Sequence, residues 1–239
     1  MKILITNDDG IDASGLAVLA EAAAPFGQVT VLAPRYQSSA MSHHATFNRD
    51  MAIQEVNFPV KEGVKAYTMD GTPADCIRAS FLGIMPDRPD FVFSGINAGA
   101  NVGFDVLYSA TVGAGMEALL YGTPAICFSQ LMRGCEEVRE KYLLPVMEEV
   151  MGMPFDGHSL INVNFPSCTL KDYRGILRDR KLSQQALYDD SYRIVTEEDG
   201  TRKVVMTPIL RSEAEEGSDM KAIFDGYISI GRIKNMALL

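Results

Sequence analysis

Short apolar runs alternate with longer amphipathic segments along the first two thirds of the chain. Apolar runs of strand length, typical of strands buried in a sheet, occupy residues 2–6, 28–33, 91–94, 125–129 and 159–165. Helical patterns occupy residues 15–24, 111–121 and 136–151, and a further helix is expected to begin at Thr72, because threonine suits an N-cap and Pro73 the first turn. Parallel strands need such crossovers between them. The alternation therefore predicts an α/β fold with a Rossmann-like, doubly wound and mostly parallel sheet.

The pattern becomes more polar beyond residue 174. Turn signals at Asp199-Gly200 and Asp225-Gly226 lie between strand-like runs. We therefore expect an α/β catalytic core over residues 1–174 and a C-terminal β-rich extension over residues 175–239. Because the extension has too few strand signals for a core of its own, we expect it to contact another subunit as an oligomerisation arm.

Composition and charge narrow the class of protein without choosing a function. A hydrophobic content of 47% with 22% charged residues is typical of a globular protein. The formal net charge of −9 argues against binding of long nucleic acid, which needs a basic face. Small anions remain compatible with this charge, because a bound cation or backbone amides can hold them.

Neither export nor membrane insertion is expected from the sequence. The N-terminus enters directly into a strand-like run, without a basic segment and a cleavage site. The apolar stretch over residues 91–128 is interrupted by Asn97, Asn101 and Pro124. The four cysteines form no CxxC pair, which fits a reducing compartment. We therefore expect a cytoplasmic protein that contacts no membrane.

Two adjacent carboxylates follow the first predicted strand. Asp8 and Asp9 precede Gly10, which permits a sharp turn out of the strand. Adjacent acids repel unless a cation joins them, and Mg²⁺, Mn²⁺ and Ca²⁺ prefer oxygen ligands. The pair favours a divalent-metal site, with an Asx turn or a helix cap as the alternative.

Further polar loops follow other predicted strands, at the edge where ligands bind in doubly wound sheets. Hydroxyl groups over residues 37–42 could complete the shell of a cation, although an ordinary solvent loop is the simpler account. Asn97 offers a neutral carbonyl oxygen. Ser109 and Thr111 stand at a predicted helix start whose free amides suit a phosphate, and N-capping is an alternative and compatible role.

Other binding motifs are absent or weak. The adjacent His43 and His44 lack the i, i+4 spacing of a helical zinc pair, so we expect surface or core packing from them. Neither a GxGxxG dinucleotide motif nor a P-loop occurs, which disfavours those two classes of nucleotide site.

Several segments together resemble the SurE family, the survival protein E nucleotidases. In the order expected for that family, they are ILITNDDGI (3–11), QSSAMSHHAT (37–46), GTPADC (71–76), SGINAGAN (94–101) and YSATVGAGMEALLYGTP (108–124). A weaker match, EGSDMKAIFDGYISI (216–230), lies near the C-terminus.

The resemblance implies a 5'/3'-nucleotidase that hydrolyses nucleoside 5'- and 3'-monophosphates, and in some members short polyphosphate. It also implies a Rossmann-like core whose extension forms a homodimer or homotetramer. One divalent cation (Mg, Mn or Ca) would bind to Asp8, Asp9, Ser39 and Asn97, and the phosphate site would be lined by Asn101, Ser109 and Thr111. We expect a metal-activated water to attack the phosphate, with Asp8 or Asp9 as its catalytic proton acceptor.

The chain departs from the family pattern at three positions near these residues. Ala40 follows Ser39 where the family has glycine, Ala110 replaces a glycine at the predicted helix start, and Arg35 stands where an acid follows the proline. If Ala110 must adopt a left-handed conformation, alanine costs about 1–2 kcal/mol there and slows the enzyme. A negative φ would leave this alanine unstrained.

Two alternatives to a metal-dependent nucleotidase stay open. Asp8 could be a covalent nucleophile, as in phosphatases that form an aspartyl-phosphate, although the second acid expected two positions later is replaced by Gly10. The non-enzymatic alternative is a nucleotide-binding regulatory module with little turnover, which the complete set of oxygen ligands disfavours.

Overall fold

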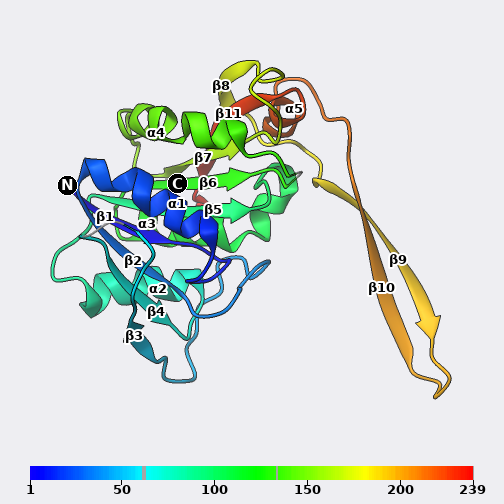
Figure 1. Cartoon of the computed structure of the whole chain (residues 1–239). Coiled ribbons are helices and arrows are strands. Elements are labelled where there is room, and N and C mark those ends of the chain that lie inside the picture. The colour runs from blue at the N-terminus through cyan, green and yellow to red at the C-terminus, as the bar shows by residue number, and fades with distance from the viewer. Residues whose placement is uncertain (61–62, 133, 239) are drawn as a thin grey trace.

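A large mixed sheet forms the centre of the molecule (Figure 1). The computed structural model describes residues 1–60, 63–132 and 134–238. The strand order is β3-β4-β2-β1-β5-β6-β7-β11-β8. The six inner strands that run parallel are β4 (Lys65–Met69), β2 (Gln28–Pro34), β1 (Lys2–Thr6), β5 (Phe91–Ala98), β6 (Ala125–Gln130) and β7 (Ser159–Phe165). The expected α/β fold with a mostly parallel sheet is confirmed.

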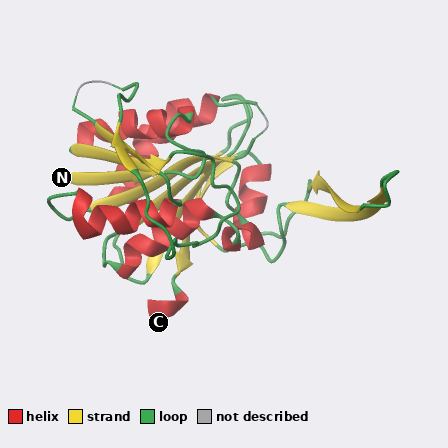
Figure 2. Cartoon of the chain, turned by 90° about the horizontal axis from the view of Figure 1, so that it is seen from below, coloured by secondary structure: helices red, strands yellow, loops and turns green. Residues whose placement is uncertain are grey.

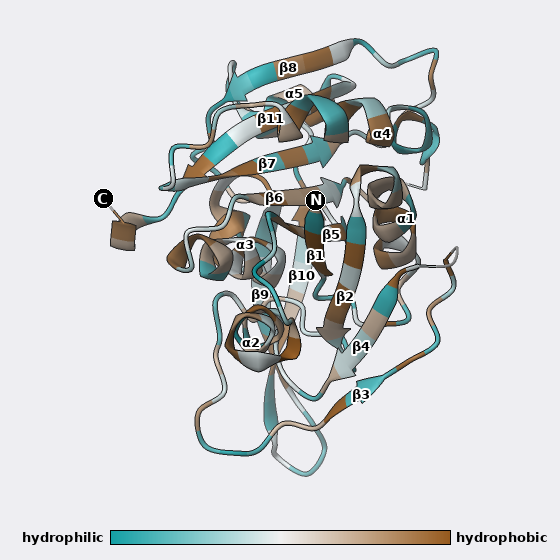
Figure 3. Cartoon of the chain, turned by 90° about the vertical axis from the view of Figure 1, so that its left-hand side faces the viewer, coloured by the Kyte–Doolittle hydropathy of each residue, from teal (hydrophilic) through white to brown (hydrophobic). Residues whose placement is uncertain are grey.

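Two helices cover each face of this sheet (Figure 3). One face carries α1 (Ser14–Ala23) and α4 (Glu137–Met151), and the other carries α2 (Pro73–Ala79) and α3 (Ala110–Leu120). Side chains alternate across a strand, so Ile3 and Ile5 of β1 pack beneath α1 and α4, whereas Leu4 packs beneath α2 and α3. Burial on both faces explains why these strands are continuous apolar runs.

Antiparallel strands lie at both edges of the sheet. At one edge β3 (Ile53–Glu55) pairs with β4, and at the other β11 (Tyr227–Lys234) pairs antiparallel with β7 and parallel with β8 (Gly175–Arg180). Ile228 and Ile230 of β11 are buried in the cluster beneath α1 and α4. The sheet therefore extends past residue 174, into the segment that the sequence analysis assigned to the extension.

Between β8 and β11, the strands β9 (Tyr188–Thr196) and β10 (Arg202–Leu210) form an antiparallel hairpin that projects from the body (Figures 1 and 2). The helix α5 (Asp219–Phe224) returns the chain to the sheet, where Met220 and Ile223 meet Val102 and Leu187 in a smaller third cluster. The remaining short turns are η1 (Ala24–Phe26), η2 (Ser80–Ile84), η3 (Gly103–Leu107) and η4 (Met236–Leu238). Within the described residues, this hairpin is the part of the extension that projects from the body.

Strand β5 is longer than the apolar run that predicted it. After an irregularity between Ser94 and Asn97, Asn97 pairs with Ser129 of β6. A Cβ atom at Gly95 would lie 2.2 Å from the Phe128 carbonyl oxygen, so only glycine fits where the two strands approach. The extension of the strand places Asn97 at the carboxyl edge of the sheet.

No helix among the described residues is long and apolar enough to cross a membrane.

Candidate functional site

The site lies where the order of strand addition reverses. From β1 the chain proceeds to β2 and β4 on one side, and then returns to β5 on the other side of β1. In open α/β sheets, ligands bind beyond the carboxyl ends of the strands at such a switch point. The segments that follow β1 and β2, together with the end of β5, carry Asp8, Asp9, Ser39 and Asn97.

Asp8 is the buried acid of the site. Its relative exposure is 3%, and the Thr111 hydroxyl donates a hydrogen bond of 2.6 Å to its Oδ1. Burial raises the pKa of Asp8 to about 6; the hydrogen bond from Thr111 acts in the opposite direction, and the charge of Asp9 adds to the rise. A carboxylate held in this way favours a nearby positive charge.

Asp9 is half-buried and joins the turn after β1 to the end of β5. The N–H of Ala98 donates to Asp9 Oδ2 at 3.0 Å. The amide Nδ2 of Asn97 donates to the Gly99 carbonyl at 2.9 Å, which leaves Oδ1 as the side-chain atom that could ligate a cation. Gly10, at φ +98°, makes the turn that brings the two acids to this edge.

Ser39 lies beside this group in the loop after β2. The neighbouring Ser38 N–H donates to the Asp8 carbonyl at 2.7 Å, and the Ser39 hydroxyl accepts from Gln37 Nε2 at 3.1 Å. No hydrogen bond joins the Ser39 side chain to either aspartate among the described residues. Ala40, the next residue, has a left-handed φ of +58°.

Ser109 and Thr111 stand at the start of α3, as predicted. The Ser109 hydroxyl caps the helix by accepting from the Val112 N–H at 3.0 Å. Ala110 is the first residue of the helix and is not among the residues with positive φ. The hypothesis of a left-handed Ala110 is therefore wrong, because a helix start requires the ordinary right-handed conformation, which alanine adopts without strain.

Asn101 is buried within a network that ties its loop to β6 and β7. Its Nδ2 donates to Ser129 Oγ at 2.7 Å, its N–H donates to Asn164 Oδ1 at 2.8 Å, and its carbonyl accepts from Asn162 and Asn164. Since its amide donor already has a protein partner, contact with a phosphate stays a prediction for this residue.

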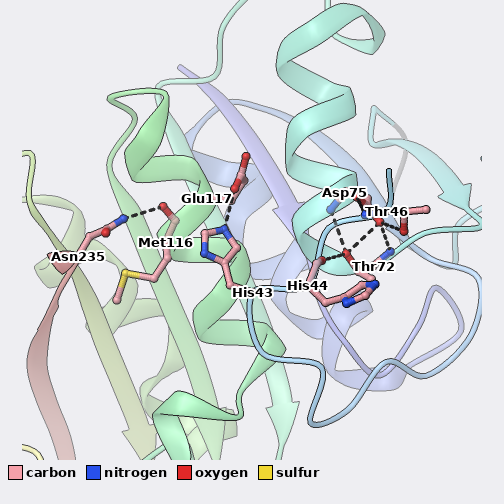
Figure 4. Close-up of polar contacts among 8 residues, drawn as sticks. All are labelled: His43, His44, Thr46, Thr72, Asp75, Met116, Glu117 and Asn235. Carbon is pink, nitrogen blue, oxygen red and sulfur yellow. Dashed lines mark hydrogen bonds and ion pairs between the residues drawn. The ribbon is translucent and has the colours of Figure 1, made fainter. Parts of the chain in front are cut away.

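The contacts that hold the loop after β2 were not predicted from the sequence (Figure 4). His43 was expected to pack, and its Nε2 lies 2.6 Å from Oε2 of Glu117, a buried residue of α3. On the other side Asp75 accepts from the Thr46 N–H and hydroxyl, at 2.9 and 2.7 Å. Burial alone would raise the pKa of Asp75, but hydrogen bonds from Thr72 and Thr46 hold it below its usual value. A histidine next to a hydroxyl-rich loop gives no sequence signal for these partners.

The candidate ligands of the site are two carboxylates and neutral oxygens. In the part of the chain that the structure describes, no group of three or more His, Cys, Asp or Glu side chains is placed to hold a metal ion. Soft or borderline metals depend on Cys and His ligands, whereas hard divalent cations accept carboxylate, amide and hydroxyl oxygens. The donor chemistry therefore fits Mg²⁺, Mn²⁺ or Ca²⁺ rather than zinc.

The chain is similar to known proteins of one family. The family model for Survival protein SurE matches residues 3–186. Two proteins named 5'-nucleotidase SurE are similar to this chain over 96% of its length. The protein from Clostridium botulinum (strain Langeland / NCTC 10281 / Type F) is 32% identical, and the match covers 91% of that protein. The protein from Synechococcus sp. (strain JA-3-3Ab) is 36% identical, and the match covers 90% of that protein. The crystal structure of SurE protein from Aquifex aeolicus superposes with a TM-score of 0.83 at 29% identity, covering 98% of this chain and 93% of that one. The resemblance noted from the sequence is confirmed, and the chain belongs to the SurE family.

Proposed function

We propose that this protein is a metal-dependent nucleotidase that releases phosphate from nucleoside 5'-monophosphates. The observation that carries the proposal is the oxygen-rich group at the switch point, where the buried Asp8 lies beside Asp9 and is hydrogen-bonded by Thr111. The relatives named 5'-nucleotidase support the same activity. Nucleoside 3'-monophosphates and short polyphosphate complete the proposed range of substrates.

One divalent cation is proposed to bind to Asp8, Asp9, Ser39 and Asn97. Burial without a counter-charge is costly for a carboxylate, and no basic side chain in the described part of the chain contributes to the pKa of Asp8. When bound, the cation would stabilise charge on the phosphoryl group and lower the pKa of the attacking water.

The residues of this chain would hold the phosphate and move the proton. The N–H groups of Ala110 and Thr111 have no hydrogen-bond partner among the described residues, and they lie at the positive end of the α3 dipole. They are proposed to bind phosphate oxygens, with Ser109 and Asn101 lining the same site. Asp8 or Asp9 would take the proton of the attacking water, and Thr111 orients Asp8 for this role.

A cavity beside the site offers room for the nucleoside. It measures about 300 Å³ and its wall includes Ser38, Met41, Met69 and Thr72. Mixed apolar and hydroxyl surface of this kind suits a base and a ribose. We propose that the nucleoside lies here while its phosphate reaches the aspartates.

The test is phosphate release from a panel of nucleoside 5'- and 3'-monophosphates, with p-nitrophenyl phosphate as the non-nucleotide control. Activity should require added Mn²⁺ or Mg²⁺, and kcat/KM should be higher for the nucleotides than for the control. Full activity in excess EDTA would overturn the metal assignment. Equal kcat/KM for p-nitrophenyl phosphate would overturn the nucleotide assignment.

We also propose that the β9–β10 hairpin forms the contact of a homodimer or homotetramer. Tyr192 is opposite Met206 and Ile194 is opposite Val204, so these four side chains share one face, and each is at least 52% exposed. A lone two-stranded hairpin is marginally stable in water. Packing against another copy would bury this apolar face.

A further inference from the structure

The cavity beside the candidate metal site also contains positive charge. Its lining includes Arg35 and Arg49 in a chain whose formal net charge is −9. Ser38 lines the same cavity and hydrogen-bonds to the Asp8 backbone at 2.7 Å. The cavity therefore begins one residue from the candidate metal ligand Ser39.

The two arginines differ in how their charges are used. Arg49 is engaged by Asp70: its Nη1 lies 3.1 Å from Oδ2, and its Nη2 donates to the carbonyl at 2.8 Å. Arg35 is half-buried and its N–H is fixed to the Met69 carbonyl at 2.8 Å. Its guanidinium has no hydrogen bond or ion pair among the described residues. Arg35 thus presents a free guanidinium group. A guanidinium group has planar, paired N–H donors that match two phosphate oxygens, so arginine suits this kind of phosphate contact better than lysine does.

The sheet places Arg35 and the aspartates on neighbouring segments. Arg35 follows β2, which lies between β1 and β4, whereas Asp8 and Asp9 follow β1. Neighbouring strands are about 4.8 Å apart, so the backbones of the two segments leave the sheet side by side. Arg35 lines the cavity proposed for the nucleoside. Two phosphates joined by one bridging oxygen would both lie at the aspartates, whereas a phosphate on the 3' carbon is separated from the 5'-phosphate by the ribose, which that cavity is proposed to hold.

We propose that Arg35 binds a second phosphate carried on the ribose, which makes nucleoside 3',5'-bisphosphates preferred substrates of the site. The proposal rests on the nucleotidase function proposed above. The 5'-phosphate is hydrolysed: a water oxygen bonds to phosphorus, the bond from phosphorus to the ribose oxygen breaks, and that oxygen takes the proton. The 3'-phosphate stays on the sugar and is released as part of a nucleoside 3'-monophosphate.

The experiment compares three substrates: adenosine 5'-monophosphate, adenosine 3',5'-bisphosphate and adenosine 5'-diphosphate. The proteins are the wild type, Arg35→Gln and the matched control Arg174→Gln, which removes an exposed arginine between β7 and β8. An arginine–phosphate contact corresponds to about a tenfold change in kcat/KM. The ratio of kcat/KM for the bisphosphate over the monophosphate should be about ten in the wild type and in Arg174→Gln, and about one in Arg35→Gln.

Two results would overturn the proposal: an equal ratio in the wild type and Arg35→Gln, or a loss in Arg35→Gln that falls on the diphosphate instead of the bisphosphate. If no monophosphate is hydrolysed by the wild type, the proposed function itself fails. Calorimetric binding of adenosine 3',5'-bisphosphate then decides, since tenfold weaker binding to Arg35→Gln would support the anion site and equal binding would overturn it.

Discussion

At the scale of single residues, the site depends on a carboxylate whose burial opposes folding. The pKa of Asp8 is raised from 3.8 to about 6, so the folded protein binds this proton more tightly than the unfolded chain does. The contribution of Asp8 to the free energy of unfolding is therefore most favourable below about pH 4, and this contribution is lost as the pH rises through 6. At neutral pH the loss amounts to about 3 kcal/mol at most.

Asp8→Asn should consequently stabilise the metal-free protein at pH 7.5. We expect Tm in EDTA to rise by several degrees, because roughly 2–4 °C corresponds to 1 kcal/mol in a protein of this size. The rise should vanish at pH 4, where the wild-type carboxyl is protonated. Asp50→Asn, an exposed control, should change Tm little at either pH. A lower Tm for Asp8→Asn in EDTA would contradict the assigned cost of burial.

Ala40 and Ala110 should respond in opposite directions to substitution by glycine. Ala40, at φ +58°, has a left-handed conformation that costs alanine about 1–2 kcal/mol. Glycine removes this cost but makes the unfolded chain more flexible, so Ala40→Gly should stabilise the folded protein by about 0.5–1 kcal/mol. Ala110 begins α3, so Ala110→Gly should destabilise by up to about 1 kcal/mol. Urea unfolding measures both, and changes of the same sign would refute this account.

These alanines show what sequence reasoning misses at a single residue. Asp8, Asp9 and Thr111 were predicted as neighbours because strand ends converge at one edge of a parallel sheet. The backbone angle at Ala110 was not predictable, because it depends on where the helix begins in three dimensions. Strain occurs at Ala40 instead, in a loop whose path is fixed by contacts with distant elements.

At the scale of elements, α2 and α3 clamp the loop that carries Ser39. His43 meets Glu117 on α3, the Ser42 N–H donates to the Tyr108 carbonyl at 2.8 Å, and Thr46 is bound by Asp75 on α2. A Cβ atom on Gly113 would lie 2.4 Å from the Ser42 carbonyl oxygen, which shows how closely the loop approaches α3. The clamp fixes the loop that carries the candidate ligand Ser39, and its side chains are not among those proposed to bind the phosphate.

His43→Ala should therefore weaken cation binding more than turnover. We expect the Mn²⁺ concentration for half-maximal activity to rise about tenfold, the equivalent of one lost hydrogen bond of about 1.4 kcal/mol, with kcat at saturating Mn²⁺ within about twofold of the wild type. His158→Ala replaces an exposed histidine outside the loop and is the matched control. An unchanged Mn²⁺ requirement in His43→Ala would rule out the positioning role.

The elements themselves were largely predictable, because buried strands and amphipathic helices have distinct periods in the sequence. The exceptions have physical causes. The end of β5 is polar and glycine-rich, so its apolar run stops at Ser94 although pairing with β6 resumes at Asn97. The clamp joins residues far apart in the sequence, which a local pattern cannot reveal.

At the scale of the whole molecule, β9 and β10 reach away from the body with an apolar face exposed. Ile194→Asp should convert an oligomer into monomers, since a buried charge at the centre of this face opposes association. Arg193→Asp, on the opposite face of the same strand, should leave the mass unchanged in light scattering at micromolar concentration. A monomeric wild type, with the hairpin ordered on its own subunit, would contradict the proposed contact.

The β character of the C-terminal region was predicted from its turns, but its distribution was not. β11 and β8 extend the main sheet beyond β7, whereas β9 and β10 form the separate hairpin that projects from the body. β11 pairs with β7, which lies more than sixty residues earlier in the sequence. The alternation of Ile228 and Ile230 indicates that one face of β11 is buried, but it does not indicate which strand pairs with β11. The division into a catalytic core over residues 1–174 and an oligomerisation extension over residues 175–239 stays a prediction.

The central claim is that Asp8 and Asp9 hold the cation on which phosphate release depends. Its most direct test measures Mn²⁺ binding by calorimetry and phosphate release from adenosine 5'-monophosphate in the same preparations of the wild type and Asp9→Asn. The account predicts one bound Mn²⁺ per chain in the wild type, at least tenfold weaker binding in Asp9→Asn, and a loss of most turnover, with an unfolding transition that stays cooperative. Wild-type Mn²⁺ affinity and turnover in a folded Asp9→Asn protein would contradict it.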